Sequence, residues 1–65
     1  MKLPHLRQRR QRALLTQQQL AVRAALTRQT ISEIEHGGDV RLETVRKLAA
    51  ALRCKPEDLM ELEPR

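Results

Sequence analysis

AALTRQTISEIE, residues 24–35, contains neither glycine nor proline, yet we expect it to hold the boundary between two helices. The reason is Thr27. A threonine hydroxyl accepts a hydrogen bond from a backbone N–H two or three residues later, so threonine begins a helix better than it continues one. The sequence therefore predicts a turn at Ala25 and Leu26 and a new helix after Thr27.

A second helix start lies eleven residues upstream, at Thr16. Residues 16–19 read TQQQ and match the capping box, in which a Thr hydroxyl and a Gln amide each satisfy a backbone donor at the start of a helix. Two short helices joined by a turn, over about residues 16–36, predict a helix-turn-helix unit. The second helix of such a unit can lie in the major groove of DNA. The expected buried positions of the two helices are Leu20, Ala21, Ala24, Ile31 and Ile34.

The rest of the chain adds three predicted helices and no strand, because apolar residues recur at intervals of three and four. A first helix is expected over about residues 5–13, and two C-terminal helices over 42–62. His36, Gly37 and Gly38 end the third helix, and Pro56 opens the fifth. The fold class is therefore all-α, a compact five-helix bundle with residues 1–65 as one domain. The remaining expected core positions are Leu6, Leu42, Val45, Leu48, Ala49, Leu52, Cys54, Leu59 and Met60.

Composition excludes several classes of protein. Apolar residues are 40% of the 65, but none is aromatic, which counts against RNA-binding modes that stack bases on aromatic side chains. One cysteine and two isolated histidines, His5 and His36, give no metal-ligand spacing, so no metal or other cofactor is expected. No apolar run is long enough to span a membrane. We expect a soluble protein of the reducing cytoplasm, with Cys54 as a small core residue.

Charge is distributed unevenly along the chain. The net charge is +5, and seven Lys and Arg residues precede the first acid, Glu33, whereas four acids fall within residues 57–65. A basic surface suits a polyanion, either nucleic acid or an anionic membrane. The alternative interpretation is an ordinary solvated helix surface.

The third predicted helix offers polar side chains for reading DNA. Arg28, Gln29, Ser32 and Glu33 project away from Ile31 and its buried neighbour Ile34. Arginine can bond bidentately to guanine, glutamine to adenine, and glutamate can accept from cytosine. These residues could instead be solvated first-turn residues. Arginine opposes the helix dipole there, however, and a cation at that site is better explained by DNA.

The chain resembles the Cro/C1-type, or XRE-like, helix-turn-helix repressors over roughly residues 6–60. The resemblance runs through TQQQLA at 16–21, LTRQTISEIEHG at 26–37 and LETVRKLAAALRCKPEDLM at 42–60. It implies a lambda-repressor-like DNA-binding fold and a pair between Arg10 and Glu35. It also implies base contacts by Arg28, Gln29, Ser32 and Glu33. The phosphate contacts that it implies are Gln17, Thr27, Thr30, His36, Gly38 and Arg41.

Three positions depart from the family pattern. Leu14, Ala25 and Arg53 stand where relatives commonly have glycine. A residue with a side chain in the left-handed conformation is strained by about 1 kcal/mol or more.

We therefore expect a sequence-specific regulator of transcription, a repressor that binds double-stranded DNA as a homodimer on an inverted repeat. The acidic segment 59–62 is the expected dimer contact. Catalysis is not expected, because there is no nucleophile with a base, no phosphate loop and no metal cluster. One alternative is an antitoxin that binds DNA and a toxin or another regulatory protein. A second is a basic helical module that binds a protein or a membrane surface.

Overall fold

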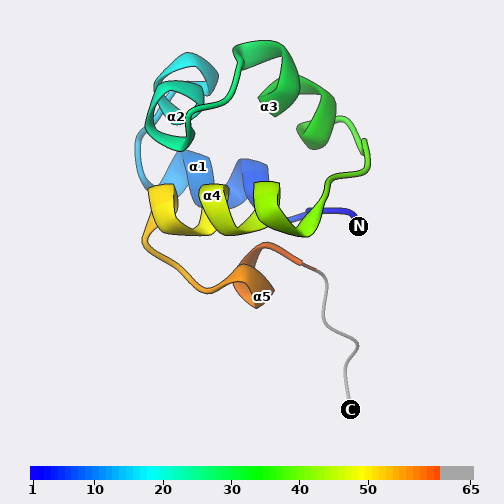
Figure 1. The fold of residues 1–65 in the computed structure, drawn as a ribbon. Helices are drawn as coiled ribbons and strands as arrows, with labels where there is room; N and C mark the ends of the chain where they lie inside the picture. Colours follow the sequence, from blue (N-terminus) through cyan, green and yellow to red (C-terminus); the bar gives the residue numbers. More distant parts are fainter. Residues whose placement is uncertain (61–65) are drawn as a thin grey trace.

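The computed structural model describes residues 1–60, and every regular element within them is a helix. In chain order the helices are α1 (Leu6–Arg12), α2 (Gln17–Ala24), α3 (Arg28–Glu35), α4 (Leu42–Leu52) and α5 (Pro56–Leu59). Figure 1 shows α2 and α3 on one side of α1 and α4, with α5 on the other side of α4. The expected all-α fold with five helices is confirmed. No helix within residues 1–60 is long and apolar enough to cross a membrane.

The break inside AALTRQTISEIE is where the sequence predicts it. Thr27 has an extended backbone, and its Oγ1 accepts from the Thr30 N–H at 3.2 Å. The capping box upstream is also present, since Thr16 Oγ1 accepts from the Gln19 N–H at 3.1 Å. The Thr16 N–H donates in return to Gln19 Oε1 at 2.9 Å. These local hydrogen bonds fix where α2 and α3 begin.

The chain leaves three helices through left-handed residues that carry side chains. The φ angles are 58° at Leu14, 57° at Ala25 and 54° at Arg53. Members of the family that the chain resembles commonly have glycine at these three positions. Gly37, at φ 96°, is the residue that follows α3 and its cap, so glycine is retained at one of the four turns.

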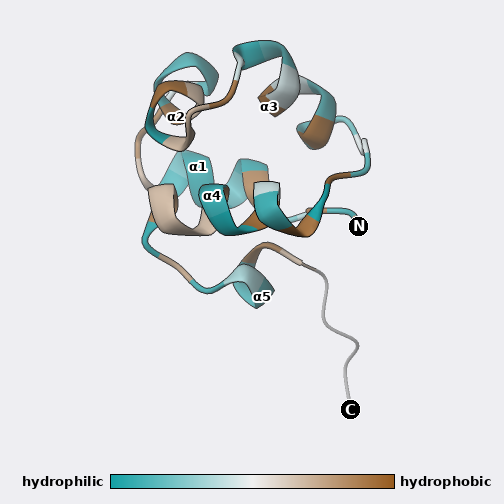
Figure 2. Cartoon of the chain, viewed as in Figure 1, coloured by the Kyte–Doolittle hydropathy of each residue, from teal (hydrophilic) through white to brown (hydrophobic). Residues whose placement is uncertain are grey.

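The core is wholly aliphatic and lies between the helices. Colouring by hydropathy shows brown apolar and teal polar residues alternating along α3 and α4, as expected of helices with one buried face (Figure 2). Leu26 and Cys54 pack against this core from partly buried positions. The buried apolar residues are Leu3, Leu6, Leu20, Ala21, Ala24, Ile31, Ile34, Val45, Leu48, Ala49 and Leu59.

Two expectations about burial are wrong. Leu42 belongs to the expected apolar stripe of α4 but is 44% exposed, because it occupies the first position of the helix, at the edge of the core. Leu59 was expected both in the core and in the dimer contact, and its exposure of 0% confirms the first expectation and contradicts the second, because it closes the core beneath α4. Met60, the next residue of that expected surface, is half-buried against the core. Glu61 and Leu62 lie outside the described residues, as does the expected end of the last helix at residue 62.

The sequence gives no expectation for the N-terminal segment, residues 1–3. In the structure this segment lies against the loop between α3 and α4. Leu3 is 2% exposed, and its carbonyl accepts from the Leu6 N–H at 3.2 Å. The Val40 N–H donates to the Met1 carbonyl at 2.7 Å. The segment is therefore held at both ends, by the core and by the α3–α4 loop.

Candidate nucleic-acid interface

The outward face of α3 carries the four side chains expected to read DNA bases. Arg28, Gln29 and Glu33 are exposed and Ser32 is half-buried, whereas Ile31 opposite them is fully buried. Arg28, Gln29 and Ser32 line one shallow groove. Because the inner face is used by the core, these polar groups are available to a partner without any rearrangement of the fold.

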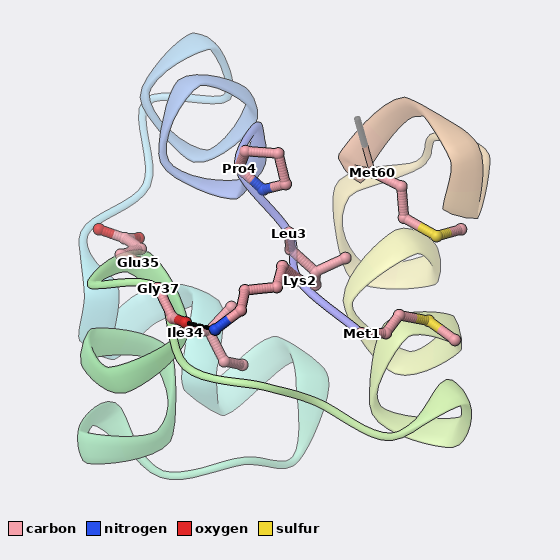
Figure 3. Close-up of a pocket in the computed structure, with 8 residues that line it drawn as sticks. All are labelled: Met1, Lys2, Leu3, Pro4, Ile34, Glu35, Gly37 and Met60. Atoms are coloured by element: carbon pink, nitrogen blue, oxygen red, sulfur yellow. Dashed lines mark hydrogen bonds between the residues drawn. The ribbon is translucent and has the colours of Figure 1, made fainter. Parts of the chain in front are cut away.

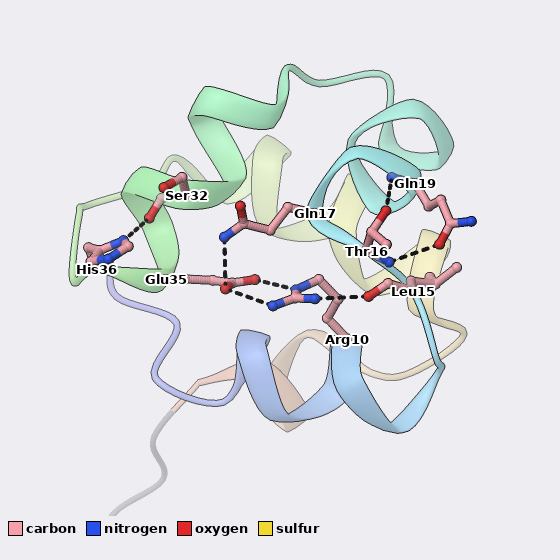
Figure 4. A network of polar contacts seen from close by, with 8 residues as sticks. All are labelled: Arg10, Leu15, Thr16, Gln17, Gln19, Ser32, Glu35 and His36. Atoms are coloured by element: carbon pink, nitrogen blue, oxygen red, sulfur yellow. Dashed lines mark hydrogen bonds and ion pairs between the residues drawn. The ribbon is translucent and has the colours of Figure 1, made fainter.

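The orientation of α3 is fixed by an ion pair at its far end (Figure 4). Arg10 of α1 donates from Nε to Glu35 Oε2 at 2.6 Å and from Nη2 to Glu35 Oε1 at 3.1 Å. Its Nη1 donates to the Leu15 carbonyl at 2.9 Å. The side chains are 12% and 4% exposed, so the pair lies inside the molecule. One guanidinium thus joins α1, the α1–α2 turn and α3, and the pair predicted from the sequence is present.

Burial and pairing act in opposite directions on the Glu35 carboxyl. Burial alone would raise its pKa, because it disfavours the charged form. Hydrogen bonds from Arg10 and Gln17 and the positive charge of Arg10 outweigh that effect, so the pKa of Glu35 lies below its ordinary value. Glu35 is therefore an anion at neutral pH and keeps its ion pair with Arg10 there.

Gln17 has a structural partner that the sequence did not indicate. Its Nε2 donates to Glu35 Oε1 at 3.2 Å, and the residue is half-buried at the first position of α2. An amide nitrogen carries two N–H donors, so one remains for another acceptor. The start of α2 and the end of α3 are thereby connected at the expected phosphate-binding residue.

Thr27 and Thr30 are joined to each other at the start of α3. Their hydroxyl oxygens lie 2.9 Å apart, and Thr27 Oγ1 also accepts from the Thr30 N–H. Only one hydroxyl hydrogen is used between the two side chains, whichever of them donates. The other hydroxyl can donate to an outside acceptor such as a phosphate oxygen.

The α3–α4 loop, residues 36–41, lies beside the outward face of α3. Arg41 is exposed and lines a second shallow groove together with Thr30 and Glu33. His36 Nδ1 lies 2.7 Å from the Ser32 carbonyl oxygen, which can only accept, so Nδ1 carries the proton (Figure 4). His36 Nε2 is then the ring nitrogen left for another partner.

Gly38 has a steric role in this loop. A Cβ at this position would lie 2.8 Å from the Glu33 carbonyl oxygen, closer than side chains are found. The Gly38 N–H donates to that same oxygen at 2.8 Å. Its amide is thus used inside the protein, and the glycine lets the loop turn tightly against the end of α3.

Some side chains lie differently from what the sequence indicated. Leu14, two residues after Arg12, is 89% exposed, and Val22, directly before Arg23, is 69% exposed, so large apolar side chains lie at the surface near arginines. Lys2 reaches the α3–α4 loop, where its Nζ donates to the Gly37 carbonyl. The one sequence signal that the N-terminal segment packs against the protein is Leu3, an apolar residue directly before a proline.

Cys54 behaves as the structural residue that was expected. It is half-buried and packs against the core, and burial raises the pKa of its thiol. A thiol with a raised pKa is a poor nucleophile at neutral pH.

Comparison with known proteins agrees with this geometry. Residues 6–59 match the profile of a helix-turn-helix family, and the chain belongs to that family, the Cro/C1-type or XRE-like helix-turn-helix proteins. Its structure is similar to the crystal structure of the restriction-modification controller protein C.AhdI from Aeromonas hydrophila. The TM-score is 0.82, with 36% sequence identity and 85% of each chain covered. No curated protein matches the chain. Family and fold together define a DNA-binding domain of transcriptional regulation.

Proposed function

We propose that this protein is a sequence-specific repressor that binds double-stranded DNA as a homodimer and reads the major groove with α3. The observation that carries the proposal is the two-sided character of α3. Its inner face is locked into the core by Ile31 and Ile34, and its outer face presents Arg28, Gln29, Ser32 and Glu33. A helix held in this way can place side chains against base edges without any change in its own backbone.

Base recognition is assigned to the first turns of α3. Arg28 is the first residue of the helix, and the N-terminal residues of a recognition helix are those that meet base edges. Its guanidinium fits guanine O6 and N7, and the Gln29 amide fits adenine N6 and N7. Glu33 accepts from cytosine N4 and repels misplaced phosphates, which adds discrimination.

Phosphate contacts are assigned to groups around the ends of α2 and α3. Gln17 keeps one amide N–H after binding Glu35, and Thr27 and Thr30 together keep one hydroxyl hydrogen. His36 and Arg41 lie in the loop beside the outward face of α3. The Gly38 N–H already donates to the Glu33 carbonyl and is not free for a phosphate. Gly38 contributes instead by letting this loop lie close to α3. Such contacts position the protein on the duplex and carry no sequence information.

The dimer follows from the size of the reading surface. One recognition helix contacts only a few base pairs, and a two-fold dimer doubles the site. Successive major grooves on one side of the duplex lie roughly 34 Å apart, so we expect half-site centres about 10 base pairs apart. Bound over a promoter, such a dimer represses by occupying the DNA.

Selection of bound sequences from random duplex DNA tests this proposal. The expected result is enrichment of an inverted repeat with half-site centres about 10 base pairs apart. Binding to vesicles with anionic headgroups is measured in parallel, because Leu14 and Val22 are exposed near arginines. Enrichment of no duplex sequence, with tight binding to the vesicles, would replace the DNA-binding proposal with membrane-surface binding.

The likeness to C.AhdI suggests where the target genes lie. That protein is a restriction-modification controller, and the two chains share 36% identity over 85% of each. We infer that restriction-modification genes are the first candidates for regulation by this chain. The selected half-site, searched for upstream of such genes, tests that assignment, and its absence there would point to other targets.

A further inference from the structure

We propose that Lys2 is a further phosphate-contacting residue and that the segment Met1–Leu3 forms part of the DNA interface. This inference rests on the proposed function. It concerns a residue that lies 26 positions before Arg28 and reaches the interface only through the fold. Figure 3 shows the Lys2 side chain extending from the N-terminal segment to Gly37, at the end of α3.

The backbone of Lys2 is held on both sides. The Met1 carbonyl accepts from the Val40 N–H at 2.7 Å, and the Leu3 side chain is 2% exposed in the core. A lysine between two fixed residues has a defined position relative to the α3–α4 loop. Its ammonium can be presented to a phosphate with a smaller loss of freedom than that of a lysine on an unattached chain end.

The Lys2 ammonium keeps donors for a ligand. Nζ donates one N–H to the Gly37 carbonyl and lies 3.9 Å from Asp39 Oδ1. An ammonium has three donors, and the Lys2 side chain is 62% exposed. At least one N–H therefore remains for a ligand, on an ammonium held at Gly37, between the loop residues His36 and Gly38 in the sequence.

The charge of the loop supplies a second, independent reason. Residues 37–41 contain one acid, Asp39, and one base, Arg41, so their formal charges cancel. Asp39 would repel a phosphate brought against this loop. The N-terminal segment adds two cations beside this acid, since the Met1 ammonium lies 3.4 Å and Lys2 Nζ 3.9 Å from Asp39 Oδ1. One of them offsets Asp39, and the assembled surface is then net positive. The loop becomes attractive to DNA only together with the N-terminal segment.

The test compares four variants of the full chain on the selected duplex and on a random duplex of equal length. Lys2→Gln removes the charge, Lys2→Arg keeps it and Asp39→Asn removes the acid. Lys55→Gln is the matched control, because Lys55 is an exposed lysine in the α4–α5 turn, at the end of α4 opposite the N-terminal segment (Figure 1). Affinity is measured as a function of salt, and thermal melting is recorded for each variant.

Lys2→Gln is expected to weaken binding several-fold on both duplexes and to reduce the log-log salt slope by about 0.9 per protomer. Lys2→Arg and Lys55→Gln should keep the wild-type slope, and Asp39→Asn should strengthen binding. An unchanged slope in Lys2→Gln would overturn the phosphate contact, even if affinity falls, since Lys2 would then only hold the loop in place. A wild-type chain that binds no duplex would instead remove the proposed function itself.

Discussion

The Arg10 guanidinium and the Glu35 carboxylate meet through two hydrogen bonds, Nε to Oε2 at 2.6 Å and Nη2 to Oε1 at 3.1 Å. The two residues are 25 positions apart and join α1 to the last residue of α3. The pair has two further hydrogen bonds, since Arg10 Nη1 donates to the Leu15 carbonyl and Glu35 Oε1 also accepts from Gln17 Nε2. The pair therefore sets how the outward face of α3 is presented.

Removing one member of this pair should destabilise the fold strongly. Arg10→Met leaves the Glu35 carboxylate buried without its cation, and such a loss costs roughly 3 to 5 kcal/mol in free energy of unfolding. Arg10→Met together with Glu35→Leu should recover much of that loss, because no charge is left buried. Urea unfolding followed by circular dichroism measures all three proteins. Arg10→Met as stable as the wild type would mean that the pair contributes nothing to folding.

Acid should weaken the domain through the same carboxyl. The pKa of Glu35 is lower in the folded chain than in the unfolded chain, so its stabilising contribution is complete above the unfolded value. The contribution is then lost as the pH falls from about 4.3 through the lower folded value. Melting temperatures recorded from pH 7 to pH 2 measure the effect.

Two variants separate Glu35 from the other carboxyls. Glu35→Gln should be less stable than the wild type at pH 7 and should lose less stability between pH 4 and pH 2. Glu43→Gln changes an exposed acid in the first turn of α4 and should keep the wild-type pH profile. Parallel acid profiles for all three proteins would assign acid sensitivity to other groups.

The left-handed turn after α2 should be improved by glycine. Ala25 has φ 57° and ψ 42°, a conformation that is strained for a residue with a Cβ. Ala25→Gly relieves that strain but gives the unfolded chain more freedom, so we expect a net gain of up to about 1 kcal/mol. Ala50→Gly is the matched control, since it changes an exposed alanine inside α4 and should destabilise by about 0.5 to 1 kcal/mol. Changes of the same sign in the two variants would contradict the assigned strain.

The parts of the structure that depend on neighbouring residues could be predicted from the sequence. The Thr16 and Thr27 caps follow from hydrogen bonds that span three residues, and the buried positions Ile31 and Ile34 follow from helical periodicity. The Arg10–Glu35 pair could be predicted only because the family resemblance supplied both partners, which lie 25 positions apart.

The parts that depend on distant contacts could not be predicted. The apolar Leu3 indicates only that the N-terminal segment packs against the protein, and it does not indicate that residues 1–3 lie against the α3–α4 loop, because that contact joins segments more than 30 positions apart. The expected dimer contact at 59–62 rested on the acidic character of that segment, but local charge does not show that the Leu59 side chain is used by the core. The hydrogen bond from Gln17 to Glu35 likewise exists only after α2 and α3 have packed.

Specificity should divide between α3 and the residues around it. Arg28→Ala and Gln29→Ala should each weaken binding to the selected site by roughly 1 to 3 kcal/mol and barely change binding to random duplex, because each loses a base contact. Gln17→Ala should weaken binding to both duplexes, because it loses a phosphate contact. Arg53→Ala is the control, an exposed arginine in the turn that follows α4, and it should leave both affinities unchanged. Thermal melting must accompany Gln17→Ala, since this variant also loses the hydrogen bond to Glu35.

If Arg28→Ala lowers affinity equally for every duplex, Arg28 contacts phosphate rather than a base. The reading surface then begins further along α3, at Gln29 or Ser32.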